Sequence, residues 1–307
     1  MALDQVDLAL LDELKQDGRA PFETLGSRVG LSRTAARARV QKILDSGVVT
    51  IEAIVHPVVD GLATFAHVSI VTDGRAARSV ADEIASLDNA PFVSVVAGRF
   101  SVIAEQRTSD LGQMEERVAQ VRDIAGVASI DTVLYTDVVK DSHLPLGGPH
   151  AFRQFDLDDV DRRLLTLLQT EPRMPYADLA DHVGLSRGAT RARVLRMLKD
   201  GVVVVTGMTN ATAFGITQMC GFQVNLDREG SAAVEKIASL RDVDFLARTL
   251  GRCDVIGTII ARNRVDMHQV LDEIRAYDGV RDMEAWSHLE LVKERYSPQS
   301  EPSRRTG

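Results

Sequence analysis

The chain contains one segment twice. The letters VGLSRTAARARV occupy residues 29–40, and VGLSRGATRARV occupies residues 183–194. Around them, residues 3–49 align with residues 157–203 without a gap, and 24 of the 47 aligned positions are identical. Later, AGRFSVIAE aligns with LGRCDVIGT, and Lys140 aligns with Lys293. Self-similarity over such a length indicates a duplicated unit, so the chain is expected to fold as two related halves.

Composition limits what these halves can be. A chain of 307 residues is long enough for two to four domains. Hydrophobic residues make up 45% of it and aromatic residues only 5%, so the cores should be aliphatic. The net charge of −8 excludes a uniformly basic nucleic-acid coat, but it allows a local basic surface.

The sequence also indicates a cellular compartment. Cys220 and Cys253 lack metal-ligand spacing, and we expect both to be buried small hydrophobes in a reducing cytosol. The N-terminal residues include acids throughout and no basic stretch, so no signal peptide is expected. No apolar run approaches the roughly 20 residues of a membrane span. We therefore expect a cytoplasmic protein with no membrane partner.

Each half begins with a three-helix pattern. Asp4 is placed to cap a first helix, and Gly30 is placed to end a second one in the left-handed conformation. Ser32 then caps a third helix that runs to about Asp45. Gly47 stops this helix, and VVTIEAIVH is strand-like. Three short helices followed by a β wing predict a winged helix-turn-helix.

The remainder of each half alternates strand and helix in the order β-α-β-β-α-β, which is the ferredoxin-like arrangement. The predicted fold class is therefore α+β, with two copies of a winged helix-turn-helix followed by a ferredoxin-like domain. The predicted boundaries are 1–60 and 156–208 for the helix-turn-helix domains, 61–140 and 209–296 for the ferredoxin-like domains, 141–155 for a linker, and 297–307 for a disordered tail.

The third helices, 32–45 and 186–199, carry the charge pattern of DNA-recognition helices. Residues 31–44 contain four basic side chains and no acid, and residues 185–198 do the same. Such a helix reaches base edges with its N-terminal side chains, and its other cations hold phosphates. Since one arginine per helix can instead pair with a neighbouring acid, we assign that structural role to Arg39 and Arg193. The predicted DNA contacts are Ser32, Arg33, Thr34, Arg37, Gln41, Lys42, Ser186, Arg187, Arg191 and Arg196.

These motifs together resemble the Lrp/AsnC family, the leucine-responsive and asparagine-operon regulators. The shared pattern is LDxxDxxLLxxL, VGLSR, RxRV and GVV, followed by a β-α-β-β-α-β segment with GRxxVI, and it covers residues 3–140 and 156–293. The resemblance implies a transcription factor whose second domain binds an amino acid or another small effector and mediates dimerisation. An ordinary member has one copy of each domain, so this chain departs from the family as a tandem fusion.

The resemblance also implies an effector site. In the family, the loop between the middle strands reads Gly-x-x-Asp, and its Asp helps to form the pocket. The second copy keeps this Asp, whereas the first has Ser, and a Thr typical of the last strand survives only in the first copy. We expect Asp254 to anchor the working site; the alternative is that both pockets bind nothing. The implied effector-binding residues are Gly98, Ser101, Thr132, Gly251 and Asp254.

The predicted partners follow from this reading. They are double-stranded DNA with an imperfectly palindromic site, a small effector that we expect to be an amino acid, and further copies of the chain in a homodimer or higher homo-oligomer through the ferredoxin-like domains. Whether the two ferredoxin-like domains pair within one chain or between chains stays open at this point. No cofactor or metal is expected.

An enzyme is the alternative. Siroheme decarboxylases resemble the same family and can be fused in tandem, but their signature, as the resemblance implies it, is a stretch rich in His, Tyr and Arg across the middle strands. Those strands read FVSVVAGRFSVIAEQ and FLARTLGRCDVIGTII here, with no His or Tyr. The seven histidines are scattered without ligand spacing: His56, His67, His143, His150, His182, His268 and His288. We therefore predict a DNA-binding regulator and no catalytic residues.

Overall fold

The computed structural model describes residues 3–142, 155–209, 218–228 and 230–295. The first half contains helices α1 (Gln5–Gln16), α2 (Phe22–Val29), α3 (Arg33–Asp45), α4 (Ala77–Ser86) and α5 (Leu111–Arg122), the short 3-10 helix η1 (Pro57–Asp60), and strands β1 (Val49–Val55), β2 (Thr64–Thr72), β3 (Phe92–Ala97), β4 (Val102–Thr108) and β5 (Val127–Asp141). The expected linker and tail lie almost entirely outside the described residues.

The second half repeats this order. Its elements are α6 (Asp159–Thr170), α7 (Tyr176–Val183), α8 (Arg187–Lys199), β6 (Val203–Thr209), β7 (Gln218–Leu226), α9 (Ser231–Ser239), β8 (Val243–Leu250), β9 (Val255–Ala261), α10 (Arg264–Arg275) and β10 (Val280–Glu294). In the described residues, and apart from η1, each half therefore has three helices, one strand and a β-α-β-β-α-β unit, which confirms the α+β fold class with two tandem copies. None of the helices in the described ranges is both long and apolar enough to cross a membrane.

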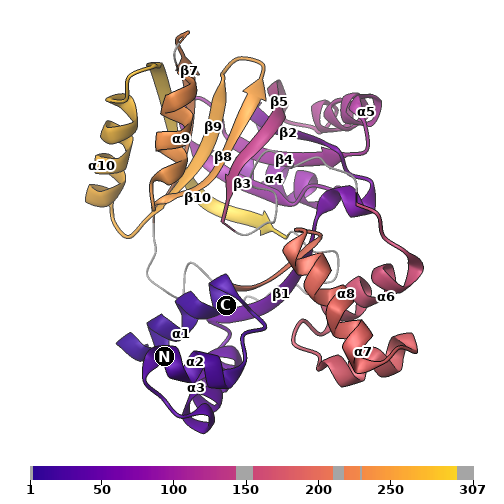
Figure 1. The fold of residues 1–307 in the computed structure, drawn as a ribbon. Coiled ribbons are helices and arrows are strands. Elements are labelled where there is room, and N and C mark those ends of the chain that lie inside the picture. The colour runs from indigo at the N-terminus through magenta and orange to yellow at the C-terminus, as the bar shows by residue number, and fades with distance from the viewer. Residues whose placement is uncertain (1–2, 143–154, 210–217, 229, 296–307) are drawn as a thin grey trace.

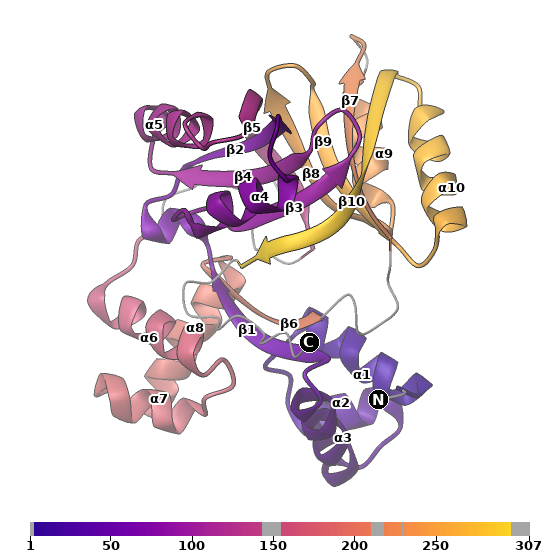
Figure 2. The same ribbon diagram turned by 180° about the vertical axis from the view of Figure 1, so that it is seen from behind.

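The two ferredoxin-like units share one closed β-barrel (Figures 1 and 2). The strand order is β10-β3-β4-β2-β5-β8-β9-β7, and β7 pairs with β10 to close the ring. The seams between the halves are the antiparallel pairs β5–β8 and β10–β3. The ferredoxin-like units of one chain thus pair with each other, which settles the question that the sequence left open.

The barrel separates three apolar layers. Its interior is filled from both halves, with Phe65 and Ile103 from the first and Ile256 and Trp286 from the second. Helices α4 and α5 cover the outer face of the first half's sheet, and α9 and α10 cover that of the second (Figure 1). Both cysteines are buried and unpaired, as expected.

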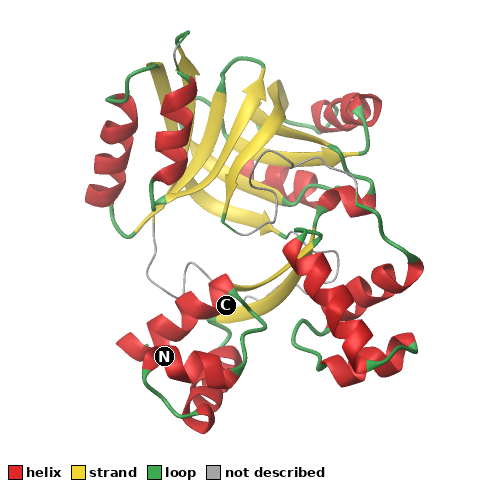
Figure 3. Cartoon of the chain, in the orientation of Figure 1, coloured by secondary structure: helices red, strands yellow, loops and turns green. Residues whose placement is uncertain are grey.

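The strand after each third helix differs from the expectation of a local wing. Strands β1 and β6 come from opposite halves and pair antiparallel with each other, from Val49–Thr209 to Val55–Val203 (Figure 3). At the centre of this ribbon Glu52 faces its own repeat equivalent, Thr206, so the pseudo-two-fold axis passes between them. A lone strand leaves its backbone groups unpaired, and the equivalent strand of the other half satisfies them.

Two arginines hold the helix-turn-helix units together across this axis. Arg19 donates to the carbonyls of Pro172 (2.5 Å) and Met174 (2.7 Å). Its equivalent, Arg173, donates to the carbonyls of Gly18 (2.5 Å) and Ala20 (2.9 Å). Burial, followed by the nearby charge of Arg19, lowers the pKa of Arg173. We call these four hydrogen bonds the arginine clasp.

At the barrel, two lysines make equivalent hydrogen bonds from one half to the other. Lys140, near the end of β5, donates to the carbonyl of Leu240 at the end of α9 (2.7 Å). Lys293, near the end of β10, donates to the carbonyl of Ala85 in the last turn of α4 (2.8 Å). Each ammonium group therefore lies at the negative end of a helix in the other half. The aligned lysines of the sequence are explained by this inter-half contact.

We predict that Arg173→Met lowers the free energy of unfolding by about 1–3 kcal/mol, because the carbonyls of Gly18 and Ala20 lose their donors in a partly buried place. Urea denaturation followed by circular dichroism measures the change. The control is Arg281→Met, since Arg281 is exposed and pairs with the neighbouring exposed Asp282, so its loss should change stability by less than about 0.5 kcal/mol. Equal losses in both variants would contradict a stabilising clasp.

Candidate functional site

The third helices α3 and α8 begin at serine caps. The Ser32 Oγ accepts from the Ala35 N–H and the Ser186 Oγ accepts from the Ala189 N–H, both at 3.2 Å. The preceding helices α2 and α7 end at Gly30 and Gly184, in the left-handed conformation that lets the chain turn sharply. In the repeated sequence VGLS, the Gly thus ends the second helix of each half and the Ser begins the third.

The basic face of each third helix is exposed. Among the described residues, the side chains of Arg33, Arg37, Arg187 and Arg191 form no ion pair. Since these four guanidinium groups lie on equivalent helices of the two halves, the molecule presents two related cationic surfaces. Thr34, Gln41, Lys42 and Arg196 are exposed on the same helices. This arrangement suits phosphates and the acceptor edges of bases.

The structural role predicted for the third arginine of each helix is confirmed. Arg39 Nη1 lies 2.7 Å from carboxylate oxygens of both Asp4 and Asp7, and hydrogen bonding to Asp4 raises the pKa of Arg39. Arg193 Nη1 lies 2.6 Å from Asp158 and 3.0 Å from Asp161. These arginines therefore attach the third helix of each half to the first.

The C-terminal ends of the two helices differ. The buried Asp161, which pairs with Arg193, also forms an ion pair with Arg196. This carboxylate therefore neutralises part of the positive charge of Arg196 that was expected to contact DNA. In the first half Gln41 donates to Asp45 at 2.8 Å, so it is not free in this conformation. Lys199 occupies the position equivalent to Asp45. The second helix is therefore the more cationic of the two.

The two loops that carry most of the residues expected in the effector site pack against the other half through their glycines. The Asp254 carboxylate accepts from the Leu226 N–H at 2.7 Å, and the Ser101 hydroxyl accepts from the Thr72 N–H at 3.3 Å. A side chain on Gly98 would come within 3.1 Å of Trp286, and one on Gly251 within 2.7 Å of Val133.

These two glycines therefore permit the β3–β4 loop to pack closely on β10 and the β8–β9 loop to pack closely on β5. Thr132 also lies on β5. The structure brings the loops and last strands together, but it gives Asp254 a structural hydrogen bond as well.

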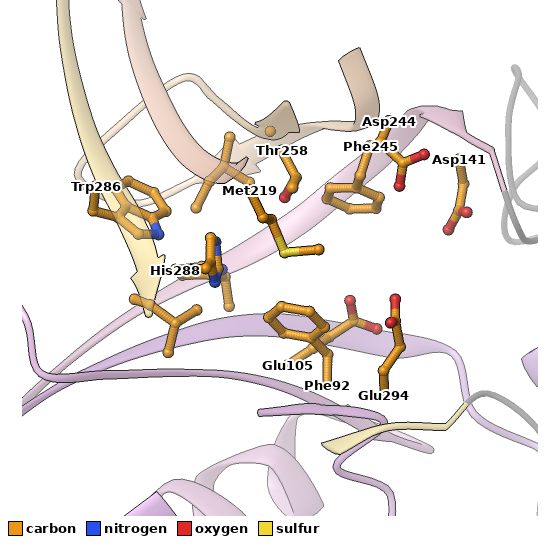
Figure 4. Close-up of a pocket in the computed structure, with 14 residues that line it drawn as sticks. Phe92, Glu105, Asp141, Met219, Asp244, Phe245, Thr258, Trp286, His288 and Glu294 are labelled. Atoms are coloured by element: carbon orange, nitrogen blue, oxygen red, sulfur yellow. The ribbon is translucent and has the colours of Figure 1, made fainter. Parts of the chain in front are cut away.

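A separate cavity lies inside the barrel, between the two halves (Figure 4). Its volume is about 50 Å³, and none of the five expected effector residues lines it. Trp286 and His288 lie at one end, Met219, Phe92 and Phe245 lie in the middle, and four carboxylates gather at the other end: Glu105, Asp141, Asp244 and Glu294. His67 also lines this cavity.

Two histidines that are far apart in the sequence thus meet in one cavity, which residue spacing did not predict. Burial, aided by the positive charge of Arg252, lowers the pKa of His67 to about 3. Burial also lowers the pKa of His288 to about 4. Both imidazoles are therefore neutral at physiological pH.

The two copies differ at these positions, and that difference was the available signal. His67 aligns with Cys220, Trp286 with Val133, and His288 with Tyr135.

Comparison with known sequences identifies the first domain of each half. The AsnC-type helix-turn-helix domain matches residues 3–43 and 157–198. An uncharacterised HTH-type transcriptional regulator of Pyrococcus abyssi is 27% identical over 140 residues, which are 45% of this chain and 89% of that protein. The HTH-type transcriptional regulator LysM of Sulfurisphaera tokodaii is 25% identical over 41% of this chain and 89% of its own length. Such relatives match about half of the chain, in keeping with a duplication.

Among solved structures, the siroheme decarboxylase NirDL matches the whole architecture. Its crystal structure superposes with a TM-score of 0.65 over 95% of this chain and 93% of its own. The sequences are only 12% identical, so the likeness concerns the fold alone.

The buried neutral histidines predict an acid-sensitive fold. With unfolded pKa values near 6.5, protonation of the unfolded state lowers stability as the pH falls from about 7 towards 4. Because the native state does not take up these protons at pH 5, each histidine should reduce the free energy of unfolding there by about 2 kcal/mol relative to pH 7.5.

The measurement compares wild type with the His67→Phe/His288→Phe variant by urea denaturation at pH 7.5 and 5. The variant should lose less stability between the two pH values, by about 4 kcal/mol. The exposed His268→Phe serves as the control and should follow wild type. A pH dependence that is unchanged in the double variant would show that these imidazoles titrate normally.

Proposed function

Since the chain is a tandem duplication of the Lrp/AsnC type, we propose that it is a sequence-specific DNA-binding transcriptional regulator with two recognition helices, 32–45 and 186–199, in one polypeptide. The observation that carries this proposal is the pair of exposed cationic faces on α3 and α8. Arg33, Arg37, Arg187 and Arg191 form no ion pair among the described residues, while the neighbouring Arg39 is used structurally.

The arrangement of the two helices supports one operator with two half-sites. The β1–β6 ribbon and the arginine clasp join the helix-turn-helix units about a pseudo-two-fold axis, and a two-fold protein reads a two-fold site. The helices differ at exposed positions, with Thr34 against Gly188 and Asp45 against Lys199. An imperfect palindrome is therefore proposed, in which the second half-site is held more by phosphate contacts.

For the effector, we propose an asymmetric site anchored by Asp254. Asp254 is exposed, and its carboxylate accepts a hydrogen bond from the Leu226 N–H. A carboxylate can bind the ammonium group of an amino acid through a charge-assisted hydrogen bond, whereas Ser101 brings no charge. Further association of chains through the ferredoxin-like domains is also part of this proposal, since the barrel closes within one chain and leaves its outer helices exposed to other copies.

We propose a regulator in preference to an enzyme of the siroheme decarboxylase kind. The shared architecture is compatible with either, and His67 and His288 line one cavity. That cavity measures about 50 Å³, whereas pockets for much smaller ligands than a tetrapyrrole already span about 300–1,000 Å³. The regulator also accounts for the two cationic helices, which a decarboxylase does not need.

The DNA-binding test uses the variants Arg37→Ala, Arg191→Ala and their combination. Operator fragments are first selected from genomic DNA with the wild-type chain. Each substitution should weaken binding by about 1–3 kcal/mol where the arginine reads a base, or reduce the salt slope by about one where it holds a phosphate. Fluorescence anisotropy over a range of salt concentrations separates these two results.

The control is Arg122→Ala, because Arg122 is exposed at the end of α5, away from the recognition helices. Base changes in one half-site should affect the Arg37→Ala variant least, and base changes in the other should affect Arg191→Ala least. Unchanged operator affinity in the double variant, with wild-type circular dichroism, would refute the assignment.

The effector test uses Asp254→Asn, which keeps an oxygen for the Leu226 N–H but removes the charge. Calorimetric titration with the twenty common amino acids should show binding to wild type and a loss of about tenfold or more in the variant, as expected for a charge-assisted hydrogen bond. Ser101→Asp supplies the missing acid to the first copy and should raise the stoichiometry. Binding that survives Asp254→Asn but disappears in Ser101→Ala would move the site to the first copy.

A further inference from the structure

The cavity inside the barrel has unpaired hydrogen-bonding atoms. Among the described residues, Trp286 Nε1, His67 Nε2 and His288 Nε2 are buried without a hydrogen-bond partner. Leaving a buried polar atom unpaired costs about 1–3 kcal/mol, so three of them around one cavity call for an occupant. His67 is buried and His288 is half-buried, both line this cavity, and the unpaired Nε2 atom of each is shielded from solvent.

The hydrogen-bond chain around His288 fixes what its free nitrogen offers. Ser94 Oγ lies 2.9 Å from the Glu290 carbonyl, which can only accept, so we assign the hydroxyl hydrogen to that bond. Ser94 must then accept from His288 Nδ1, 2.9 Å away. In the neutral imidazole this leaves Nε2 as a bare acceptor. The indole N–H of Trp286 is a donor, so one end of the cavity presents an acceptor and a donor side by side (Figure 4).

The rest of the lining limits the charge of an occupant. Phe92, Phe245 and Met219 form an apolar middle, and Glu105 at the far end is bound to Arg107 at 2.6 Å. Among the described residues, no Lys or Arg side chain lines the cavity and its two imidazoles are neutral, whereas four carboxylates line it. An anion would therefore be repelled and poorly solvated, and so would the carboxylate of an amino acid. No group of three His, Cys, Asp or Glu in the described ranges is arranged to hold a metal ion.

The cavity crosses the pseudo-two-fold axis, but the hydrogen-bonding residues at its Trp286 and His288 end have no equivalents of the same kind in the other half. Its apolar walls are symmetric, since Phe92 is equivalent to Phe245 and Ile103 to Ile256. The hydrogen-bonding residues are not: His288 is equivalent to Tyr135, and Trp286 to Val133. Two identical chains would present every polar group twice, whereas the fused chain presents one polar end and one acidic end.

We propose that this cavity is a single binding site for a small, flat, uncharged molecule that carries an N–H donor next to a nitrogen or oxygen acceptor, as pyrazole or a small amide does. The N–H bonds to His288 Nε2, the acceptor receives the Trp286 N–H, and the body lies between Phe92 and Phe245. At roughly 10–15 Å³ for each water-sized atom, about 50 Å³ holds a molecule of three to five heavy atoms. This site is separate from Asp254 and does not depend on DNA binding.

Trp286 is the only tryptophan in the chain, so its fluorescence reports occupancy of the cavity directly. The experiment titrates the full chain with pyrazole and with acetamide, using acetate as the charged comparison. We expect a saturable change in Trp286 emission with pyrazole or acetamide and none with acetate. A rise in the thermal unfolding midpoint at the same concentrations provides a second measurement.

His288→Phe removes the acceptor and keeps a ring of similar size, so it should weaken binding about tenfold or more. His268→Phe is the control, because that imidazole is exposed on α10 and should leave binding unchanged. If His288→Phe is unstable, Trp286→Phe followed by thermal shift tests the donor instead. The proposal is overturned if neither pyrazole nor acetamide gives a saturable change, if His288→Phe binds them as wild type does, or if acetate binds at least as well.

Discussion

Hydrogen bonding of strands between the two halves is the constraint on which the rest of the structure depends. Strands β5 and β8 form one seam, β10 and β3 form the other, and β1 and β6 join the helix-turn-helix units. A four-stranded β-α-β-β-α-β sheet has two open edges, and each edge here is closed by the other copy. Neither half could be separated without exposing these backbone groups and the apolar interior of the barrel.

Lysine and arginine side chains that reach from each half to carbonyl groups of the other show that the pairing of the two halves is specific. Lys140 reaches the end of α9, Lys293 reaches the end of α4, and the arginine clasp repeats the same exchange between the helix-turn-helix units. Each interaction occurs twice, once in each direction, as in an isologous dimer interface. The chain therefore contains the interface of a two-fold dimer within a single polypeptide, which makes its formation independent of protein concentration.

Local structure could be predicted from the sequence because its signals are local. Asp4 and Ser32 cap their helices and Gly30 ends one, all within a few residues of the element that they define. The role of Arg39 was also predictable, since acids at the start of α1 are required by the capping pattern. The joining of β1 to β6 was not, because a strand-like run does not reveal its partner and a wing hairpin satisfies the same pattern.

The cavity could not be predicted for a related reason. His67 and His288 are 221 positions apart and belong to strands of different halves, so only the closed order of the barrel brings them together. The loop sequence GRCD points to Asp254, but the differences between repeat-equivalent positions within the paired strands carry the signal for the cavity. At these positions His67 is equivalent to Cys220 and His288 to Tyr135.

Fusion explains why such differences are tolerated. In a homodimer a substitution near the axis appears twice, so a histidine at position 288 would bring a second, equivalent imidazole into the same small space. A fused chain changes one side only. Glu52 faces Thr206 at the centre of the β1–β6 ribbon, where a symmetric dimer would place two glutamates opposite each other. The same freedom gives Asp45 to one recognition helix and Lys199 to the other. Asymmetry at the DNA surface, at the ribbon and in the barrel thus has one physical origin: the two-fold architecture remains, but the two copies of each position are separately encoded.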